Sequence, residues 1–155
     1  MDRRELLAVL GTGAVGLAAL SGREARAAHT HRNHHQSCDA CMEACIKACG
    51  ECAKICNEMA AHCLEQLCEG KGDREHHAKS HSLGNDCQAF CVLSAQMMAR
   101  DSALMAYSCG ACAQACKACA EECEKEKGSE IMSECAEMCR KCEASCHEMV
   151  KMLKA

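Results

Sequence analysis

Cysteines recur every three or four residues through most of this chain. The first series has steps of three, four, four, three, four and seven, and it comprises Cys38, Cys41, Cys45, Cys49, Cys52, Cys56 and Cys63. At about 100° of rotation per residue, an α-helix keeps these seven side chains within an arc of roughly 80°. The spacing therefore predicts a long helix that carries a stripe of thiols along one face.

Two later segments repeat the stripe, and a segment between carries a reduced form of it. The full repeats comprise Cys109, Cys112, Cys116, Cys119 and Cys123, and then Cys135, Cys139, Cys142 and Cys146. The reduced form has only Cys87 and Cys91, and its stripe continues through Ser94 and Met98. Cys68 falls well off the arc of the first series. Because bundled helices bury stripes of this width, the thiols of four helices should face one shared interior.

The rest of the composition favours an all-α fold with a core made largely of sulfur. The chain has 155 residues, enough for one ordinary domain, with 19 Cys and 10 Met but only one Phe, one Tyr and no Trp. Proline is absent, and strand-forming runs of β-branched or aromatic residues are missing. The net charge is −4, and the lysines form no basic stripe, so nucleic-acid binding has no support.

The first 27 residues have the arrangement of a signal peptide. Arg3 and Arg4 precede a short apolar run over 8–20, and Ala25-Arg26-Ala27 supplies a cleavage site. The run is shorter than the roughly 20 apolar residues of a membrane span, although an amphipathic anchor helix is an alternative. Paired arginines favour the twin-arginine route, which exports folded proteins and would bury the thiols before they meet periplasmic oxidants. We therefore expect a periplasmic protein.

Turn residues divide the remainder into a tail and four helices. Residues 28–36 hold four histidines and no apolar periodicity, so we expect a disordered tail that is either a solvated linker or a first capture point for metal. Helices are expected over about 37–69, 73–100 and 101–127 and from 130 to near the end, with Asp101 and Ser102 as N-caps of the third. Short connections make neighbouring helices antiparallel. Residues 37–155 should therefore form an up-down-up-down four-helix bundle with a cysteine-lined core.

Four explanations compete for the thiol array. The first is that the cysteines pack only as small hydrophobic residues, which explains one or two buried cysteines better than stripes on four helices. A disulfide-crosslinked structural protein suits export, but 19 is an odd number and neighbouring cysteines on one helix would compete for the same partners. A redox enzyme or thiol sensor needs one activated thiol set apart from the others, and no position is distinguished in this way. A metal store would use thiolates one helical turn apart as ready-made ligand pairs.

Among metals, Cu(I) fits the array best. Zinc, and with it cadmium, prefers isolated tetrahedral sites, whereas these stripes are continuous and free of carboxylates. Iron–sulfur motifs lie in loops and are commonly followed by proline, which this chain lacks. Soft thiolates select Cu(I), which accepts two or three sulfurs and bridges into clusters. We therefore predict a protein that is not an enzyme and that stores several Cu(I) ions, with a zinc- or cadmium-sequestering protein as the alternative.

The two ends of the expected bundle differ in chemistry. One end would collect Met42, Met98, Met105 and Met149, with His147 nearby, and the opposite end would collect His62, His76 and Met132. Methionines at helical spacing often serve only as flexible core filler. They can also bind Cu(I) without losing a proton, so the four-methionine end is a candidate loading port.

The segment from Cys109 to Cys123, together with the paired arginines, carries a resemblance to a known family. It resembles the bacterial copper storage proteins, and in particular their exported branch from methane-oxidising bacteria, over essentially all of 37–155. The resemblance implies a four-helix bundle that can assemble into tetramers and binds many Cu(I) ions through the stripe cysteines. It also implies delivery of copper to client enzymes such as methane monooxygenase.

Overall fold

Four α-helices joined by short turns make up the part of the chain that the structure describes. The computed structural model describes residues 36–154. The predicted signal peptide and residues 28–35 of the predicted histidine tail lie outside them, whereas Gln36, the last residue of that tail, is helical. The helices are α2 (Gln36–Glu69), α3 (Arg74–Ala99), α4 (Met105–Cys123) and α5 (Glu130–Lys154). Their length and the absence of strands in this range confirm the predicted all-α class.

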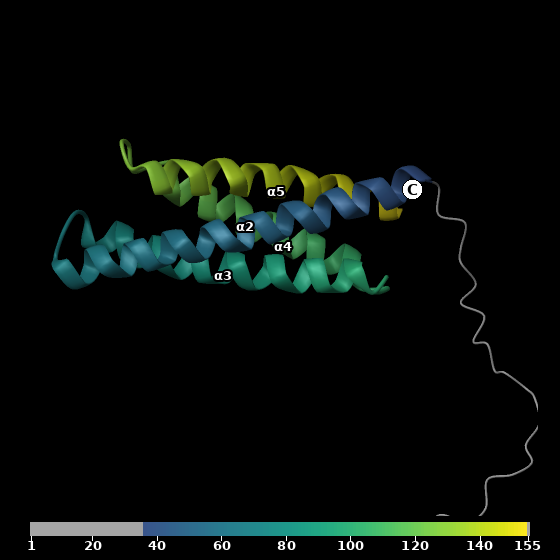
Figure 1. The fold of residues 1–155 in the computed structure, drawn as a ribbon, viewed down its shortest axis with the longest axis horizontal. Coiled ribbons are helices and arrows are strands. Elements are labelled where there is room, and N and C mark those ends of the chain that lie inside the picture. The colour runs from purple at the N-terminus through teal and green to yellow at the C-terminus, as the bar shows by residue number, and fades with distance from the viewer. Residues whose placement is uncertain (1–35, 155) are drawn as a thin grey trace, which may run out of the picture. The chain divides into compact units, whose positions relative to one another are not determined.

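The helices form a four-membered ring in which each packs against two others (Figure 1). Contacts join α2 to α3, α3 to α4, α4 to α5, and α5 back to α2, whereas the diagonal pairs have no close backbone approach. Sequence neighbours that run side by side after a short turn are antiparallel, which gives the predicted up-down-up-down bundle. The centre of the ring is therefore filled by side chains from all four helices.

The turn between α2 and α3 follows the predicted signals. Gly70, with φ of 65°, directly follows α2, where its N–H and that of Lys71 bond back to the carbonyls of Leu67 and Gln66. Asp73 caps α3 by accepting hydrogen bonds from the backbone N–H groups of Glu75 (2.9 Å) and His76 (3.2 Å). The prediction that α3 opens at Asp73 is confirmed.

The boundaries predicted for the third helix are wrong at both ends. Asp101 does not cap α4. It takes the left-handed conformation (φ 50°) and ends α3, because its N–H donates a hydrogen bond to the Met98 carbonyl and the N–H of Ser102 donates one to the Met97 carbonyl. Glycine usually fills that position, but aspartate tolerates it, so no glycine marks the boundary. At the other end, α4 stops at Cys123 and residues 124–127 form turns before Gly128.

A close approach between α2 and α3 depends on Gly84. A Cβ at this position would lie 2.7 Å from Met59 Cε, 3.1 Å from the Cys56 carbonyl oxygen and 3.3 Å from Ala60 Cβ. The absence of a side chain therefore sets how closely the two helices pack.

We expect Gly84→Ala to destabilise the fold and Gly50→Ala to stabilise it. In Gly84→Ala, overpacking should lower the free energy of unfolding by about 1–3 kcal/mol, whereas the higher helix propensity of alanine over glycine raises it by about 1 kcal/mol. A Cβ at Gly50, also within a helix, meets nothing within 4 Å, so only the propensity gain remains. Thermal unfolding of the two variants should therefore shift in opposite directions. Equal shifts would show that Gly84 does not limit the packing of α2 on α3.

Candidate metal-binding interior

The cysteines of all four helices line one continuous interior. Sixteen of the eighteen cysteines whose side chains the structure describes are buried, at Cys45, Cys49, Cys52, Cys56, Cys63, Cys87, Cys91, Cys109, Cys112, Cys116, Cys119, Cys123, Cys135, Cys139, Cys142 and Cys146. Cys41 is half-buried, Cys68 is exposed, and the side chain of Cys38 lies outside the described residues. We call the sixteen buried residues the thiol column. Its members are thiols, and no disulfide links them.

Thiols of different helices meet at the same level of the bundle. Cys52 Sγ lies 3.9 Å from Cys87 Sγ, 3.9 Å from Cys116 Sγ and 3.7 Å from Cys139 Sγ, so α2, α3, α4 and α5 each contribute one sulfur. Sulfur–metal bonds near 2.3 Å, as for zinc, place ligand sulfurs about 3.8 Å apart around one ion. The column therefore has metal-site spacing before any metal binds.

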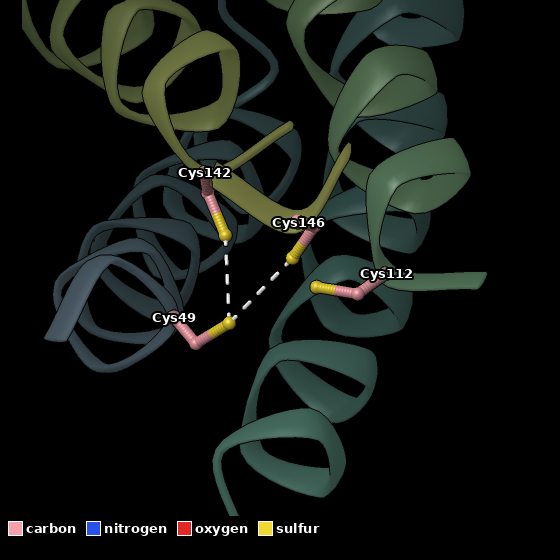
Figure 2. A group of neighbouring side chains, drawn as sticks. All are labelled: Cys49, Cys112, Cys142 and Cys146. Carbon is pink, nitrogen blue, oxygen red and sulfur yellow. Dashed lines mark hydrogen bonds between the residues drawn. The ribbon is translucent and has the colours of Figure 1, made fainter. Parts of the chain in front are cut away.

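Five groups of sulfurs lie close enough to share an ion. Within each group, every Sγ is within 4.8 Å of the others. The groups are Cys45/Cys109/Cys146, Cys49/Cys112/Cys142/Cys146, Cys52/Cys91/Cys116/Cys142, Cys52/Cys56/Cys87/Cys139 and Cys56/Cys119/Cys135/Cys139. Figure 2 shows the second of these, in which Cys49 lies 3.7 Å from Cys142 and 3.8 Å from Cys146.

Successive groups are joined by shared thiols. Cys146 belongs to the first and second groups, Cys142 to the second and third, Cys52 to the third and fourth, and Cys56 and Cys139 to the fourth and fifth. We call these five residues the linking cysteines. A ladder of shared ligands suits an ion that bridges into clusters, which is the behaviour of Cu(I) and not of isolated zinc sites.

Hydrogen bonds between thiols divide the interior into cysteines whose pKa is lowered, such as Cys52, and cysteines whose pKa is raised and which keep their protons. The pKa of Cys91 is raised because the sulfurs of Cys112, Cys116 and Cys142 hold its proton and because burial disfavours the thiolate. Burial and the charge of Glu126 raise the pKa of Cys63 to about 11. Metal binding must therefore release protons from the column.

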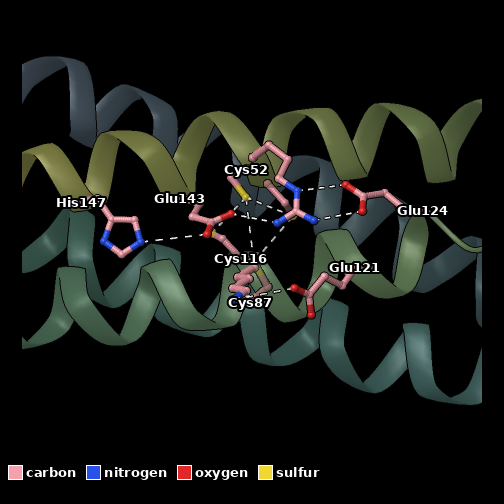
Figure 3. A network of polar contacts seen from close by, with 10 residues as sticks. Cys52, Cys87, Cys116, Glu121, Glu124, Glu143 and His147 are labelled. Carbon is pink, nitrogen blue, oxygen red and sulfur yellow. Dashed lines mark hydrogen bonds and ion pairs between the residues drawn. The ribbon is translucent and has the colours of Figure 1, made fainter.

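Charged groups near the column form ion pairs on its outside. Arg140 donates to Glu124 (2.9 Å) and to Glu143 (3.0 Å), and His147 lies 4.0 Å from Glu143 (Figure 3). The side chains of Arg140, Glu124 and His147 are between 38% and 48% exposed, so these ion pairs lie at the surface of the bundle.

The predicted methionine port is assembled from residues of the same core. Met98, Met105 and Met149 are buried with the column, and Met42 is half-buried and packs against it. The antiparallel order of the helices places all four at the end where α2 and α4 begin and α3 and α5 finish.

Three residues of the opposite end were missed by the sequence analysis. Met59 is fully buried and accepts a hydrogen bond from Cys63 Sγ (3.5 Å). His77 is 2% exposed, and Glu122 is 5% exposed, so a carboxylate does lie beside the stripe of α4. The spacing could have revealed the first two, since Met59 continues the stripe of α2 and the buried positions of α3 run back from Cys87 to His77.

The burial of Glu122 is balanced by three cationic or polar partners. Lys79 and Lys125 each lie 2.8 Å from its Oε2, and His76 Nδ1 lies 3.2 Å from its Oε1. Burial alone would raise the pKa of Glu122, but these partners outweigh it and lower the pKa to about 2. The carboxylate is therefore ionised and held in place.

Comparison with protein families gives a match over most of the chain. The model of the copper storage protein family matches residues 38–151. A search of curated proteins gives no significant match. Among the described helices, none has both the length and the apolar content required to cross a bilayer.

Solved structures of similar fold and sequence include proteins described as copper storage proteins. The Cu(I)-bound copper storage protein 3 of Bacillus subtilis is 34% identical, with a TM-score of 0.63, over 71% of this chain and 98% of its own. A cytosolic copper storage protein from Streptomyces lividans with five coppers is 29% identical, with a TM-score of 0.67, over 74% and 96%. A protein from Nitrosospira multiformis is 36% identical, with a TM-score of 0.63, over 73% and 97%. With its four-helix fold and its cysteine-lined interior, this chain belongs to the copper storage protein family.

Proposed function

We propose that this protein stores Cu(I) for exported copper enzymes and limits copper toxicity. Storage itself follows from the family and from the thiol column. The observation that carries it is the ladder of five sulfur groups joined by the linking cysteines, which can hold many ions in one interior. Its role is to bind and release metal, and no catalysis is proposed.

Anaerobic titration of the reduced protein with Cu(I) tests the storage capacity. Thiols shared between two- or three-sulfur sites set a ratio between about one ion per two thiols and one per thiol. We therefore expect on the order of ten or more Cu(I) ions per chain to remain bound after gel filtration, measured by metal analysis. Retention of only one or two ions would rule out storage, and preferential retention of zinc or cadmium over Cu(I) would favour the alternative store.

We further propose that copper enters past Met42, Met98, Met105 and Met149. Thioethers bind Cu(I) more weakly than thiolates and carry no proton, so they can pass an ion to the column. Three of the four are buried beside the thiols, which places them within the same packed cluster.

Replacing the four methionines by leucine should slow copper exchange and leave capacity unchanged. Leucine conserves volume and apolarity, so stability should change by less than about 1.5 kcal/mol. Loading from a competing Cu(I) chelator, followed by stopped-flow absorbance, should become several-fold slower. The matched control replaces His62 and His76 at the opposite end by glutamine. If that control is slowed and the leucine variant is not, the port lies at the histidine end.

Export by the twin-arginine route is part of the proposal and rests on residues 1–27 alone. The Streptomyces lividans relative is described as cytosolic, so export would set this chain apart from that relative. Cell fractionation of the full chain and of an Arg3→Lys/Arg4→Lys variant tests the route. We expect processed protein in the periplasm, and retention of the variant in the cytosol. Cytosolic location of the parent would overturn this part of the proposal.

We also propose that the protein forms a homo-oligomer, with a tetramer implied by the family resemblance. The exposed face of α3 carries Phe90, Val92 and Leu93, each between 37% and 38% exposed, which is apolar surface that an interface would cover. Light scattering after gel filtration measures the assembly. A monomer at micromolar concentration would contradict it.

A further inference from the structure

A group of nitrogen and oxygen atoms lies at the end of the bundle opposite the methionines. His76 and His77 belong to the first turn of α3, and Glu122 and Glu126 come from the end of α4 and the turn after it. Glu126 Oε2 lies 3.2 Å from His76 Nε2 and 3.9 Å from His77 Nδ1. The structure thus brings two imidazoles and a carboxylate oxygen together.

All three atoms of this group are buried and lack a hydrogen bond. They are His76 Nε2, His77 Nδ1 and Glu126 Oε2. Buried polar atoms without partners are rare in folded proteins, because each costs about 1–3 kcal/mol. Both nitrogens lie within 4 Å of the same carboxylate oxygen, so one ion bound at that oxygen would be a shared partner for all three atoms. We propose that His76, His77 and Glu126 form a second metal site, for a borderline divalent cation such as Zn²⁺, separate from the copper store.

The contacts of His76 prepare it as a ligand. Its Nδ1 faces Glu122, whose carboxylate is kept ionised by Lys79 and Lys125, so Nδ1 carries the proton and donates it. The lone pair is then on Nε2, which points to Glu126. A histidine that donates one N–H to a carboxylate and offers its other nitrogen to a metal is the usual arrangement in zinc sites.

The orientation of His77 is also set by its surroundings. Gly72, in the left-handed conformation with φ of 66°, packs so closely that a Cβ there would lie 2.5 Å from His77 Nε2. With the Nε2 edge covered by this turn, the Nδ1 edge faces Glu126. Gly72 therefore directs the second imidazole towards the carboxylate.

Charge and distance both favour a cation at this point. Two lysines balance Glu122, whereas the Glu126 Oε2 contacts are to the two imidazoles. Zinc bonds to nitrogen and oxygen are about 2.0–2.2 Å, so its ligand atoms lie roughly 3.3 Å apart. The His76–Glu126 distance already matches, and a shift of the Glu126 carboxylate, whose side chain is 31% exposed, would shorten the 3.9 Å distance to His77 Nδ1 and bring in the third ligand. An adjoining open pocket of about 410 Å³, lined by His76, Glu122 and Glu126 among others, gives access and room for water as a fourth ligand.

Ligand type keeps this site separate from the store. Cu(I) prefers the thiolates of the column, whereas imidazole and carboxylate suit zinc. An ion held by His76, His77 and Glu126 would fasten the start of α3 to the end of α4. It would thereby close the end of the bundle that the four methionines do not occupy.

Zinc and cobalt titration of the copper-loaded protein tests the site. The histidine tail would also bind these ions, so the full chain is used with His29, His31, His34 and His35 replaced by glutamine. The thiols are first saturated with Cu(I), which is verified by metal analysis in the same sample. We expect one further Zn²⁺ per chain to survive desalting, and Co²⁺ to give a nitrogen/oxygen spectrum without a sulfur charge-transfer band.

Substitutions at the site should lower zinc affinity without changing the copper store. Glu126→Gln and His76→Gln, each made in the tail-substituted chain, should weaken zinc binding at least tenfold and leave Cu(I) capacity and helical circular dichroism unchanged. His81→Gln is the matched control, since His81 lies on the same helix and its Nδ1 hydrogen-bonds with the Ala60 carbonyl (2.8 Å). Absence of a further Zn²⁺, an unchanged affinity in Glu126→Gln, an equal loss in His81→Gln, or a sulfur band with Co²⁺ would each overturn the proposal.

Discussion

Loading the reduced protein with Cu(I) is expected to raise its melting temperature by tens of degrees. A ligand at a hundredfold excess over its dissociation constant adds about 2.7 kcal/mol per site, so four such sites add about 11 kcal/mol. In a domain of this size, 1 kcal/mol corresponds to about 3–5 °C. The helices do not depend on the metal, because the protonated thiols are apolar and already form the core. The apo-protein should therefore be helical but much less stable.

Anaerobic thermal scans followed by circular dichroism measure this difference. The samples are the reduced apo-protein, the loaded protein and the loaded protein after removal of copper by a strong chelator, which should return to the apo value. A random-coil spectrum for the reduced apo-protein would contradict a preformed bundle and place the chain with metallothionein-like proteins, which fold only around metal.

Removing four linking cysteines should cost about twice as much copper capacity as removing four cysteines outside the ladder. The first variant replaces Cys52, Cys56, Cys139 and Cys142 by alanine, and each of these belongs to two sulfur groups. The second variant replaces Cys41, Cys63, Cys68 and Cys123, which belong to none of the five groups. Together the four linking cysteines take part in four of the five sulfur groups, whereas the second set takes part in none, so the first variant should lose about twice as many ions as the second.

Metal analysis after Cu(I) titration of both variants measures the two losses. Both variants remove four thiols, so a difference in copper loss reports the position of those thiols in the ladder and not how many were removed. Both must first show helical circular dichroism, since alanine leaves small cavities in the core. Equal losses would mean that the ions occupy independent sites instead of a ladder.

The cysteine pattern predicts most of this fold because spacing and burial are coupled on a helix. A residue that recurs every three or four positions must return to one face, so the register of α2, α4 and α5 follows from the positions of their cysteines. The start of α3 is equally local, since Asp73 follows the glycines of the turn. The end of α3 could not be predicted in this way. Its stop is a left-handed Asp101, whose own N–H bonds to the Met98 carbonyl while the N–H of Ser102 bonds to the Met97 carbonyl, and no turn residue such as glycine announces these contacts.

The site could be predicted less completely than the fold. The sequence identifies which thiols face inwards, but sharing of Cys52 between two groups depends on distances across three other helices. Glu122 looks like an ordinary surface residue of α4. Its burial is balanced by His76 and Lys79 from α3 and by Lys125 from the turn after α4. Such a combination involves residues far apart in the chain, and no local spacing reveals it.

The burial of the thiol column determines the order in which stored copper ions can be exchanged. Its sixteen cysteine residues are at most 1% exposed, and the one described stripe cysteine that is partly accessible is Cys41, near the start of α2. Ions can therefore reach the middle level, around Cys52 and Cys116, only by passing from sulfur to sulfur along the helix axis. If a first dose of one copper isotope is followed by a second isotope, the later dose should be withdrawn first. The central ions would then be the slowest to turn over, whatever their affinity.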